Sequence, residues 1–273
     1  MSNVYTVPVD GADLAVRCVG DGPPVLLIQG VGVAGCGWAP QVEALRGSYT
    51  CGVFDNRGIG GSTGGPSTLE GMARDALAVL DHLGWERAHV VGHSMGGVIA
   101  QQVALLAPDR VRSLSLLCTL SRGARIVRFD PAVLWRQTLC QIGTREMRRR
   151  AFFKLVSPRA SWHAPDIEQL ERAFDRRLDA LPRVAMAQVA ATRRHDVFDL
   201  LASLRGLPAL VVSADEDLLC PVSEGCQLAE ALGTELVVIP GAHAVPVQDP
   251  DRINGLLREH LAASDGPGGG LTG

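Results

Sequence analysis

The stretch that decides the fold runs from residue 88 to residue 107 and reads AHVVGHSMGGVIAQQVALLA. A mostly apolar run leads into Gly92-His-Ser-Met-Gly96, and a helix-like segment follows. This pattern predicts a strand, a sharp turn with Ser94 at its apex, and a helix. The two glycines let the backbone pass close to itself, where a Cβ would clash. We therefore expect the Ser94 hydroxyl above the sheet, at the positive end of the helix. A glycine-rich connection with an incidental serine is the alternative.

The surrounding sequence repeats the alternation of strand and helix. Residues 3–18 alternate around Asp10-Gly11 and predict an antiparallel hairpin. Further strands are expected at residues 25–28, 50–54, 111–117, 208–213 and 235–239, and helices at 38–46, 69–83, 222–232 and 249–262. The fold class predicted from this order is α/β, with a mostly parallel sheet covered by helices on both faces.

One segment interrupts the alternation. Residues 121–200 carry no strand pattern and are expected to form several helices inserted after the strand at 111–117. The α/β core then comprises residues 1–120 and 201–263, and residues 264–273 form a flexible tail. The insertion leaves the sheet at the edge where α/β proteins bind ligands, so a helical lid is expected. A packing block with no role in access is the alternative.

Composition narrows the class of protein. Hydrophobic residues make up 47% of the chain, the net charge is −3, and the pI is about 6.2. These values predict a sizeable core and give no reason to expect nucleic acid or an anionic membrane as partner. No apolar run approaches the roughly 18 residues of a spanning helix, and the first residues lack a signal-peptide pattern. Secretion after removal of a leader stays the alternative to a cytoplasmic location. The oligomeric state is unknown.

Cofactors and metals are not expected. The seven cysteines are scattered, without C-x-x-C or zinc spacing, which favours a reduced cytoplasmic protein without a structural metal. The stretch Gly30-Val-Gly-Val-Ala-Gly35 spells a dinucleotide-binding pattern. However, Cys36-Gly37 follow in place of a clean helix, and no ribose-binding acid is evident.

Positive charge is concentrated in the insertion. Residues 121–195 contain 15 arginines and one lysine against seven acidic residues, a surplus of nine positive charges. Solvated helix faces are the plainer explanation. The sharper hypothesis is that one or two of these arginines face the cavity and hold a substrate carboxylate.

A nucleophilic serine needs a base, and the base needs an acid that fixes its tautomer. Of the seven histidines, only His243 follows a strand end on the same edge as Ser94, directly after residues 235–239. Asp215 and Asp217 both follow the strand that ends at residue 213, so each is a candidate acid. The order serine, aspartate, histidine is that of the nucleophile-elbow hydrolases.

These motifs resemble those of the α/β-hydrolase fold family over roughly residues 3–262. The similarity is to the capped bacterial subgroup of esterases, enol-lactonases, methylesterases and cofactor-free haloperoxidases. In that family a proline commonly stands four positions after the acid, which favours Asp217 over Asp215. The resemblance implies Ser94, Asp217 and His243 as catalytic residues. The motifs that carry it are Gly92-His-Ser-Met-Gly96, Phe54-Asp-Asn-Arg-Gly-Ile-Gly-Gly-Ser62, Asp217-Leu-Leu-Cys-Pro221 and Gly241-Ala-His243.

The resemblance also implies an oxyanion hole formed by the backbone N–H groups of Val31 and Met95. Gln29-Gly30 stands where the family usually has His-Gly, a departure that concerns the hydrogen bonds inside that loop. Four residues are expected to contribute to substrate binding, with core packing as the alternative for the first tryptophan: Trp38, Gly30, Trp135 and Trp162.

The expected function is hydrolysis of a small-molecule ester or lactone through an acyl-enzyme. The same triad can instead serve C–C bond hydrolysis, perhydrolysis or lyase chemistry, and the fold does not separate these reactions. A non-catalytic ligand-binding protein is the third hypothesis.

Overall fold

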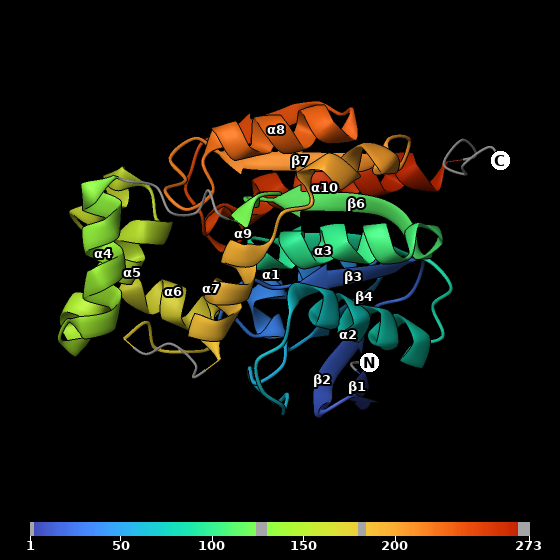
Figure 1. The fold of residues 1–273 in the computed structure, drawn as a ribbon, viewed down its shortest axis with the longest axis horizontal. Helices are drawn as coiled ribbons and strands as arrows, with labels where there is room; N and C mark the ends of the chain where they lie inside the picture. The colour runs from blue at the N-terminus through green and yellow to red at the C-terminus, as the bar shows by residue number, and fades with distance from the viewer. Residues whose placement is uncertain (1–2, 124–129, 180–183, 267–273) are drawn as a thin grey trace.

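An eight-stranded sheet forms the centre of the molecule (Figure 1). The computed structural model describes residues 3–123, 130–179 and 184–266. The strands are β1 (Asn3–Val9), β2 (Ala12–Val19), β3 (Pro24–Ile28), β4 (Thr50–Phe54), β5 (Ala88–His93), β6 (Val111–Leu117), β7 (Ala209–Ala214) and β8 (Leu236–Ile239). β1 pairs antiparallel with β2 and β2 with β4, while β3 to β8 run parallel. The predicted α/β fold class is confirmed.

The order of the strands places a crevice at the centre of the sheet. The order is β1-β2-β4-β3-β5-β6-β7-β8, so the chain adds β4 on one side of β3 and β5 on the other. Leu27 of β3 is in register with Val53 on one side and Val91 on the other. The carboxyl ends of β3 and β5 are therefore neighbours at the point where the winding reverses, the usual ligand position in α/β sheets.

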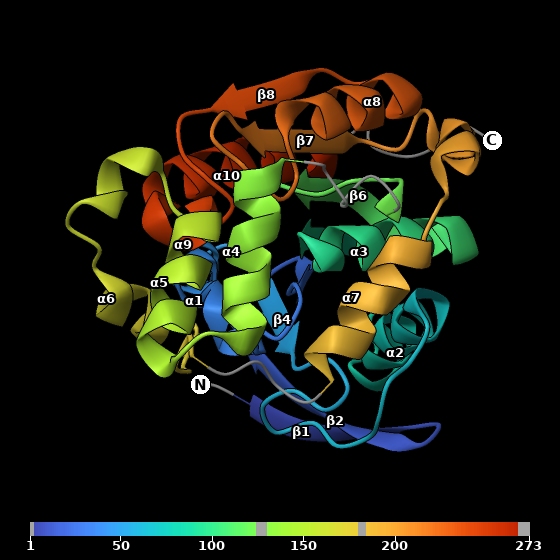
Figure 2. The same cartoon turned by 60° about the vertical axis from the view of Figure 1, so that its left-hand side comes forward.

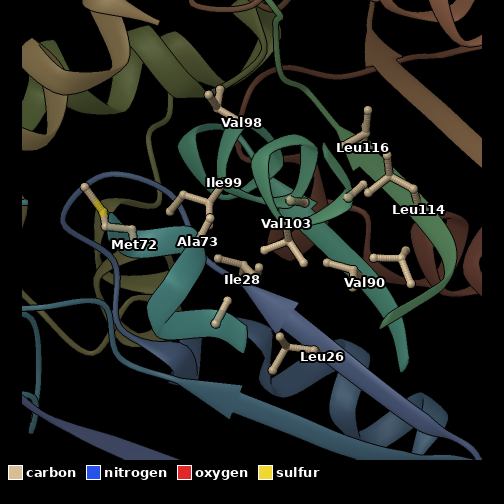
Figure 3. Packing of buried hydrophobic residues seen from close by; sticks show 14 of the residues in the cluster. Leu26, Ile28, Met72, Ala73, Val90, Val98, Ile99, Val103, Leu114 and Leu116 are labelled. Atoms are coloured by element: carbon tan, nitrogen blue, oxygen red, sulfur yellow. The ribbon is translucent and has the colours of Figure 1, made fainter. Parts of the chain in front are cut away.

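Helices cover both faces of the sheet. One layer contains α2 (Leu69–His82), α3 (Met95–Leu106) and α8 (Val222–Leu232), and the other contains α1 (Ala39–Leu45) and α10 (Pro250–Asp265). Figure 3 shows Ile99 and Val103 of α3 on the side of the helix that faces Ile28 and Val90 of the sheet. The next residue of β5, Val91, belongs to the opposite core. Burial on both faces explains why these strands are continuous apolar runs rather than alternating ones.

The insertion consists of helices within its described residues. It contains α4 (Pro131–Ile142), α5 (Arg145–Val156), η4 (Arg159–Trp162), α6 (Ile167–Ala173) and α7 (Ala185–Arg194). The side chains of Asp130, Thr144 and Asp166 cap the first turns of α4, α5 and α6. Figures 1 and 2 show these helices beyond one end of the sheet. A separate core of Phe153, Leu170 and their neighbours packs on Val33 and Ala244 from strand-end loops.

Short elements complete the fold: η1 (Gly35–Trp38), η2 (Pro108–Arg110), η5 (Phe198–Leu204) and α9 (Val245–Gln248). The last helix, α10, extends into the segment predicted as tail, because the Asp265 carboxylate accepts a 2.6 Å hydrogen bond from Arg112. Residues 267–273 of that predicted tail lie outside the described residues. In the part of the chain that the structure describes, no helix is both long and apolar enough to cross a membrane.

Candidate active site

Ser94 occupies a strained turn between β5 and α3. Its φ of 56° and ψ of −124° lie outside the conformations that serine ordinarily adopts. The backbone around it holds this geometry, since the Ser94 N–H donates to the Leu117 carbonyl at 3.0 Å and Thr119 Oγ1 donates to the Ser94 carbonyl at 2.6 Å. The hydroxyl is thereby presented at the carboxyl edge of the sheet.

The flanking glycines are required by close backbone contacts. A Cβ on Gly92 would lie 2.3 Å from the Gly96 carbonyl oxygen, and one on Gly96 would lie 2.0 Å from the Ile28 carbonyl oxygen. Both distances are too short for any side chain. The sequence pattern therefore reflects a crossing of strand, turn and helix backbones directly below the serine.

The three residues predicted as a triad lie in one chain of hydrogen bonds. Ser94 Oγ is 2.9 Å from His243 Nε2, and His243 Nδ1 is 2.8 Å from Asp217 Oδ2. The other carboxylate oxygen, Asp217 Oδ1, accepts from the N–H groups of Leu219 and Cys220, each at 2.8 Å. Because the buried carboxylate accepts at Nδ1, His243 carries its proton there, and Nε2 faces the serine as an acceptor.

The alternative acid has a different position. Asp215 is exposed and its Oδ1 accepts a 3.0 Å hydrogen bond from the Gly241 N–H. It thus braces the loop that carries His243 without reaching the imidazole. The structure brings Asp217, not Asp215, to His243.

His93 has a supporting place that the sequence reading did not find. Its side chain is buried, and its Nε2–H donates to the His243 backbone carbonyl at 2.8 Å. Burial, together with the neighbouring His243, lowers the pKa of His93 to about 3. A neutral His93 therefore fixes the loop of His243 without adding charge beside it. Its position next to Ser94 was the one signal in the sequence that could have found it.

The two expected oxyanion donors belong to segments that lie next to Ser94. Met95 is the first residue of α3, so its N–H has no acceptor within the helix. Val31 lies in the loop after β3, which approaches the serine so closely that a Cβ on Gly30 would lie 3.0 Å from Ser94 Cβ. Both Val31 and Met95 line the cavity above the serine.

Three hydrogen bonds hold that loop, one within it and two from other segments. Gln29, which replaces the usual histidine of the family, accepts from the Gly30 N–H with its Oε1 at 3.1 Å. Asn56 Nδ2 donates to the Gln29 carbonyl at 3.0 Å. From the insertion, Gln188 Oε1 accepts from the Gly32 N–H at 3.0 Å. Gln29 therefore still forms a hydrogen bond inside the loop where the family usually has histidine, and α7 bonds directly to the loop through Gln188.

A cavity of about 210 Å³ opens above Ser94. Its floor includes Ser94 and His243, and its walls are mainly apolar side chains from α5 and α7, among them Phe152, Leu155 and Val189. The shape and polarity are those of a site for a small, largely apolar molecule.

Comparison with known proteins decides the family. The family model for the alpha/beta hydrolase fold matches residues 23–250. The chain belongs to the α/β-hydrolase fold family. It is 34% identical over 252 residues to the Azorhizobium caulinodans protein named "Putative carbamate hydrolase RutD", covering 90% of this chain and 94% of that protein.

Two solved α/β-hydrolase structures agree with this chain over almost their full length. A thermophilic esterase from Thermogutta terrifontis, with malate bound, has a TM-score of 0.80 and 28% identity, covering 97% of this chain and 100% of that one. The enol-lactonase from Burkholderia xenovorans has a TM-score of 0.78 and 25% identity, covering 92% and 97%. Family membership and these relatives support a hydrolytic enzyme.

The four predicted substrate-binding residues of this α/β-hydrolase do not all lie at the cavity. Gly30 lines the cavity, whereas the three tryptophans are not among its described lining residues. Trp38 is fully buried in the core beside α1, Trp135 is 60% exposed, and the Trp162 Nε1–H donates to the Ser157 carbonyl. Trp135 is exposed because it does not lie on the inward face of α4, which carries the side chains of residues 137, 140 and 141.

Cysteine chemistry at this α/β-hydrolase site is disfavoured. Cys118 and Cys220 are buried near Asp217, and burial, reinforced by the carboxylate charge, raises the pKa of both thiols. Neither is a thiolate at neutral pH. Among the described residues, no group of three or more His, Cys, Asp or Glu side chains could hold a metal ion.

Proposed function

We propose that this α/β-hydrolase is a serine hydrolase that cleaves a small carboxylic ester or lactone. The observation that carries the proposal is the hydrogen-bonded chain from Ser94 through His243 to Asp217 on the floor of an apolar cavity. A strained, presented serine with an oriented base is the arrangement that acyl transfer requires.

The reaction follows from the positions of these groups. Ser94 Oγ attacks the substrate carbonyl carbon while His243 Nε2 takes the hydroxyl proton. The tetrahedral intermediate collapses, the bond to the leaving oxygen breaks, and His243 returns the proton to that oxygen. Water, deprotonated by His243, then attacks the acyl-enzyme and releases the acid with Ser94 regenerated. Asp217 keeps the imidazole in the required tautomer and stabilises its charged form.

The negative charge of the intermediate requires donors. The N–H groups of Val31 and Met95 are the proposed pair, because both residues line the cavity together with Ser94. Removing one such donor typically lowers kcat by about 10² to 10³. The hydrogen bonds to Gln29, Asn56 and Gln188 would keep the first donor in place.

In this proposal the insertion acts as a lid and limits the size of the substrate. A volume of about 210 Å³ suits a short or medium acyl chain. A carbamate is the second candidate substrate, since the 34% identical relative carries that name and the same attack at a carbonyl would apply.

A substrate panel tests the proposal. The purified protein and its Ser94→Ala variant are assayed with p-nitrophenyl butyrate and palmitate, a γ-lactone, an alkyl carbamate and a β-diketone. We expect an ester or the lactone to have the highest kcat/KM, butyrate to exceed palmitate, and Ser94→Ala to lose about 10³-fold or more. Fastest turnover of the carbamate would favour the second candidate. Fastest turnover of the diketone would overturn both in favour of C–C hydrolysis.

A further inference from the structure

Arg193 is the one arginine or lysine among the described residues that line the cavity. It lies in the last turn of α7, is exposed, and therefore belongs to the mouth of the cavity rather than its floor. No aspartate or glutamate is among the described lining residues. The cavity thus presents one positive charge with no acidic residue among its described lining, above a mostly apolar interior.

Other arginines of the insertion are already engaged. Arg149 forms a two-pronged pair with Glu171 at 2.9 and 2.8 Å, and the Arg150 Nε lies 2.6 Å from Glu146. For Arg193, no carboxylate of a described residue lies within 4.0 Å. A solvent-facing arginine at a helix end needs no partner, but one at the rim of a substrate cavity is available to a ligand.

The cavity lining also supplies neutral donors. Gln137 and Gln141 lie one turn apart on α4 and line the cavity. In Figure 2, α4 and α7 are in the foreground in front of the sheet. A guanidinium with two primary amides is suited to a carboxylate, because each can direct N–H groups at its oxygens.

We propose that Arg193, assisted by Gln137 and Gln141, binds a carboxylate of the substrate. The substrate class is then a half-ester of a dicarboxylic acid or a lactone that bears a carboxylate. Its ester carbonyl lies at Ser94, its apolar chain fills the cavity, and its anionic end reaches the mouth. This inference rests on the proposed function, because it assumes that the ester carbonyl is attacked by Ser94.

The test compares monomethyl glutarate with dimethyl glutarate. In the wild-type protein, kcat/KM for the half-ester should exceed that for the diester about tenfold or more, and most of this preference should persist in ~0.5 M NaCl. Screening would remove a preference that came only from diffuse charge. Arg193→Gln should bring the ratio close to one.

Arg194→Gln is the matched control, because it removes the same charge from the next residue of the same helix, outside the cavity lining. It should keep the wild-type preference. Equal losses in the two variants, or equal rates for the two esters in the wild type, would overturn the role of Arg193.

A binding measurement separates this inference from the proposed function. Inhibition of p-nitrophenyl acetate hydrolysis by monomethyl glutarate should weaken about tenfold in Arg193→Gln and stay unchanged in Arg194→Gln. Unchanged inhibition in both variants contradicts the carboxylate site alone. Absence of Ser94-dependent hydrolysis of every ester contradicts the proposed function instead.

Discussion

At the scale of single residues, the acid is the most informative position. Two aspartates follow β7, and only one residue, Glu216, separates them, yet they meet different partners. Asp217 is buried, contacts His243, and has its second oxygen fixed by two backbone N–H groups. Asp215 is exposed and contacts the backbone of Gly241. These contacts predict that replacing each aspartate with asparagine will lower kcat by different amounts.

Asp217→Asn should lower kcat by about 10³-fold or more, because an amide cannot hold the imidazole in the tautomer that accepts the Ser94 proton. Asp215→Asn should lower kcat less than about tenfold, since the amide oxygen can still accept from Gly241. Steady-state kinetics with a short p-nitrophenyl ester measure both effects. A larger loss in Asp215→Asn would show that our choice of acid is wrong.

The sequence predicted positions at strand ends better than it predicted side-chain surroundings. Ser94, Asp217 and His243 each follow a parallel strand, and the carboxyl ends of such strands meet at one edge. The surroundings of Trp38 and Trp135 depend instead on how each helix is rotated about its axis. A one-residue rotation of about 100° decides between the cavity, the core and solvent, and apolar character alone does not settle it.

At the scale of elements, α7 joins two parts of the site. Gln188 on its inner face bonds to Gly32 beside the proposed oxyanion donor, and Val189 and Arg193 line the cavity. The helix therefore holds the loop after β3 and forms part of the cavity wall. Bounds of strands and helices in the core were predictable to within a few residues, because their apolar periodicity is regular. Individual helices of the insertion were not, because their packing partners are distant in sequence.

Gln188→Met tests the link between α7 and the loop. Methionine preserves the volume but removes the acceptor for the Gly32 N–H, and a lost hydrogen bond of about 1 kcal/mol predicts a roughly fivefold fall in kcat with little change in KM. Arg194→Met, on the outer face of the same helix, is the control. A change in KM alone, or equal kinetics in both variants, would argue against a positioning role for Gln188.

At the scale of the whole molecule, several histidines are buried or partly buried in a neutral form. Burial lowers the pKa of His93 to about 3, and of His195 and His260 to about 4. In the unfolded chain these imidazoles titrate near the ordinary value of about 6.5. Above that pH both states are neutral, so the histidines impose no penalty. As the pH falls from about 6.5 toward 4, only the unfolded state gains protons, and stability is lost.

For each such histidine, the free energy of unfolding should fall by up to about 1.4 kcal/mol per pH unit as the pH decreases from about 6.5 toward 4. Denaturant unfolding at pH 7.0, 6.0 and 5.0 measures the slope, before most carboxylates titrate. His195→Gln should make the slope shallower, and His163→Gln, at an exposed position of the insertion, is the control. A wild-type stability that is constant from pH 7.0 to 5.0 would contradict this account.

The central claim is that Ser94 is an activated nucleophile, and covalent labelling tests it most directly. The protein is incubated with a fluorophosphonate, and the intact mass and the modified peptide are determined by mass spectrometry. We predict one phosphonyl adduct, located on Ser94, absent in Ser94→Ala and formed much more slowly in His243→Ala. An unmodified wild-type protein, or an adduct that persists in Ser94→Ala, would contradict the claim.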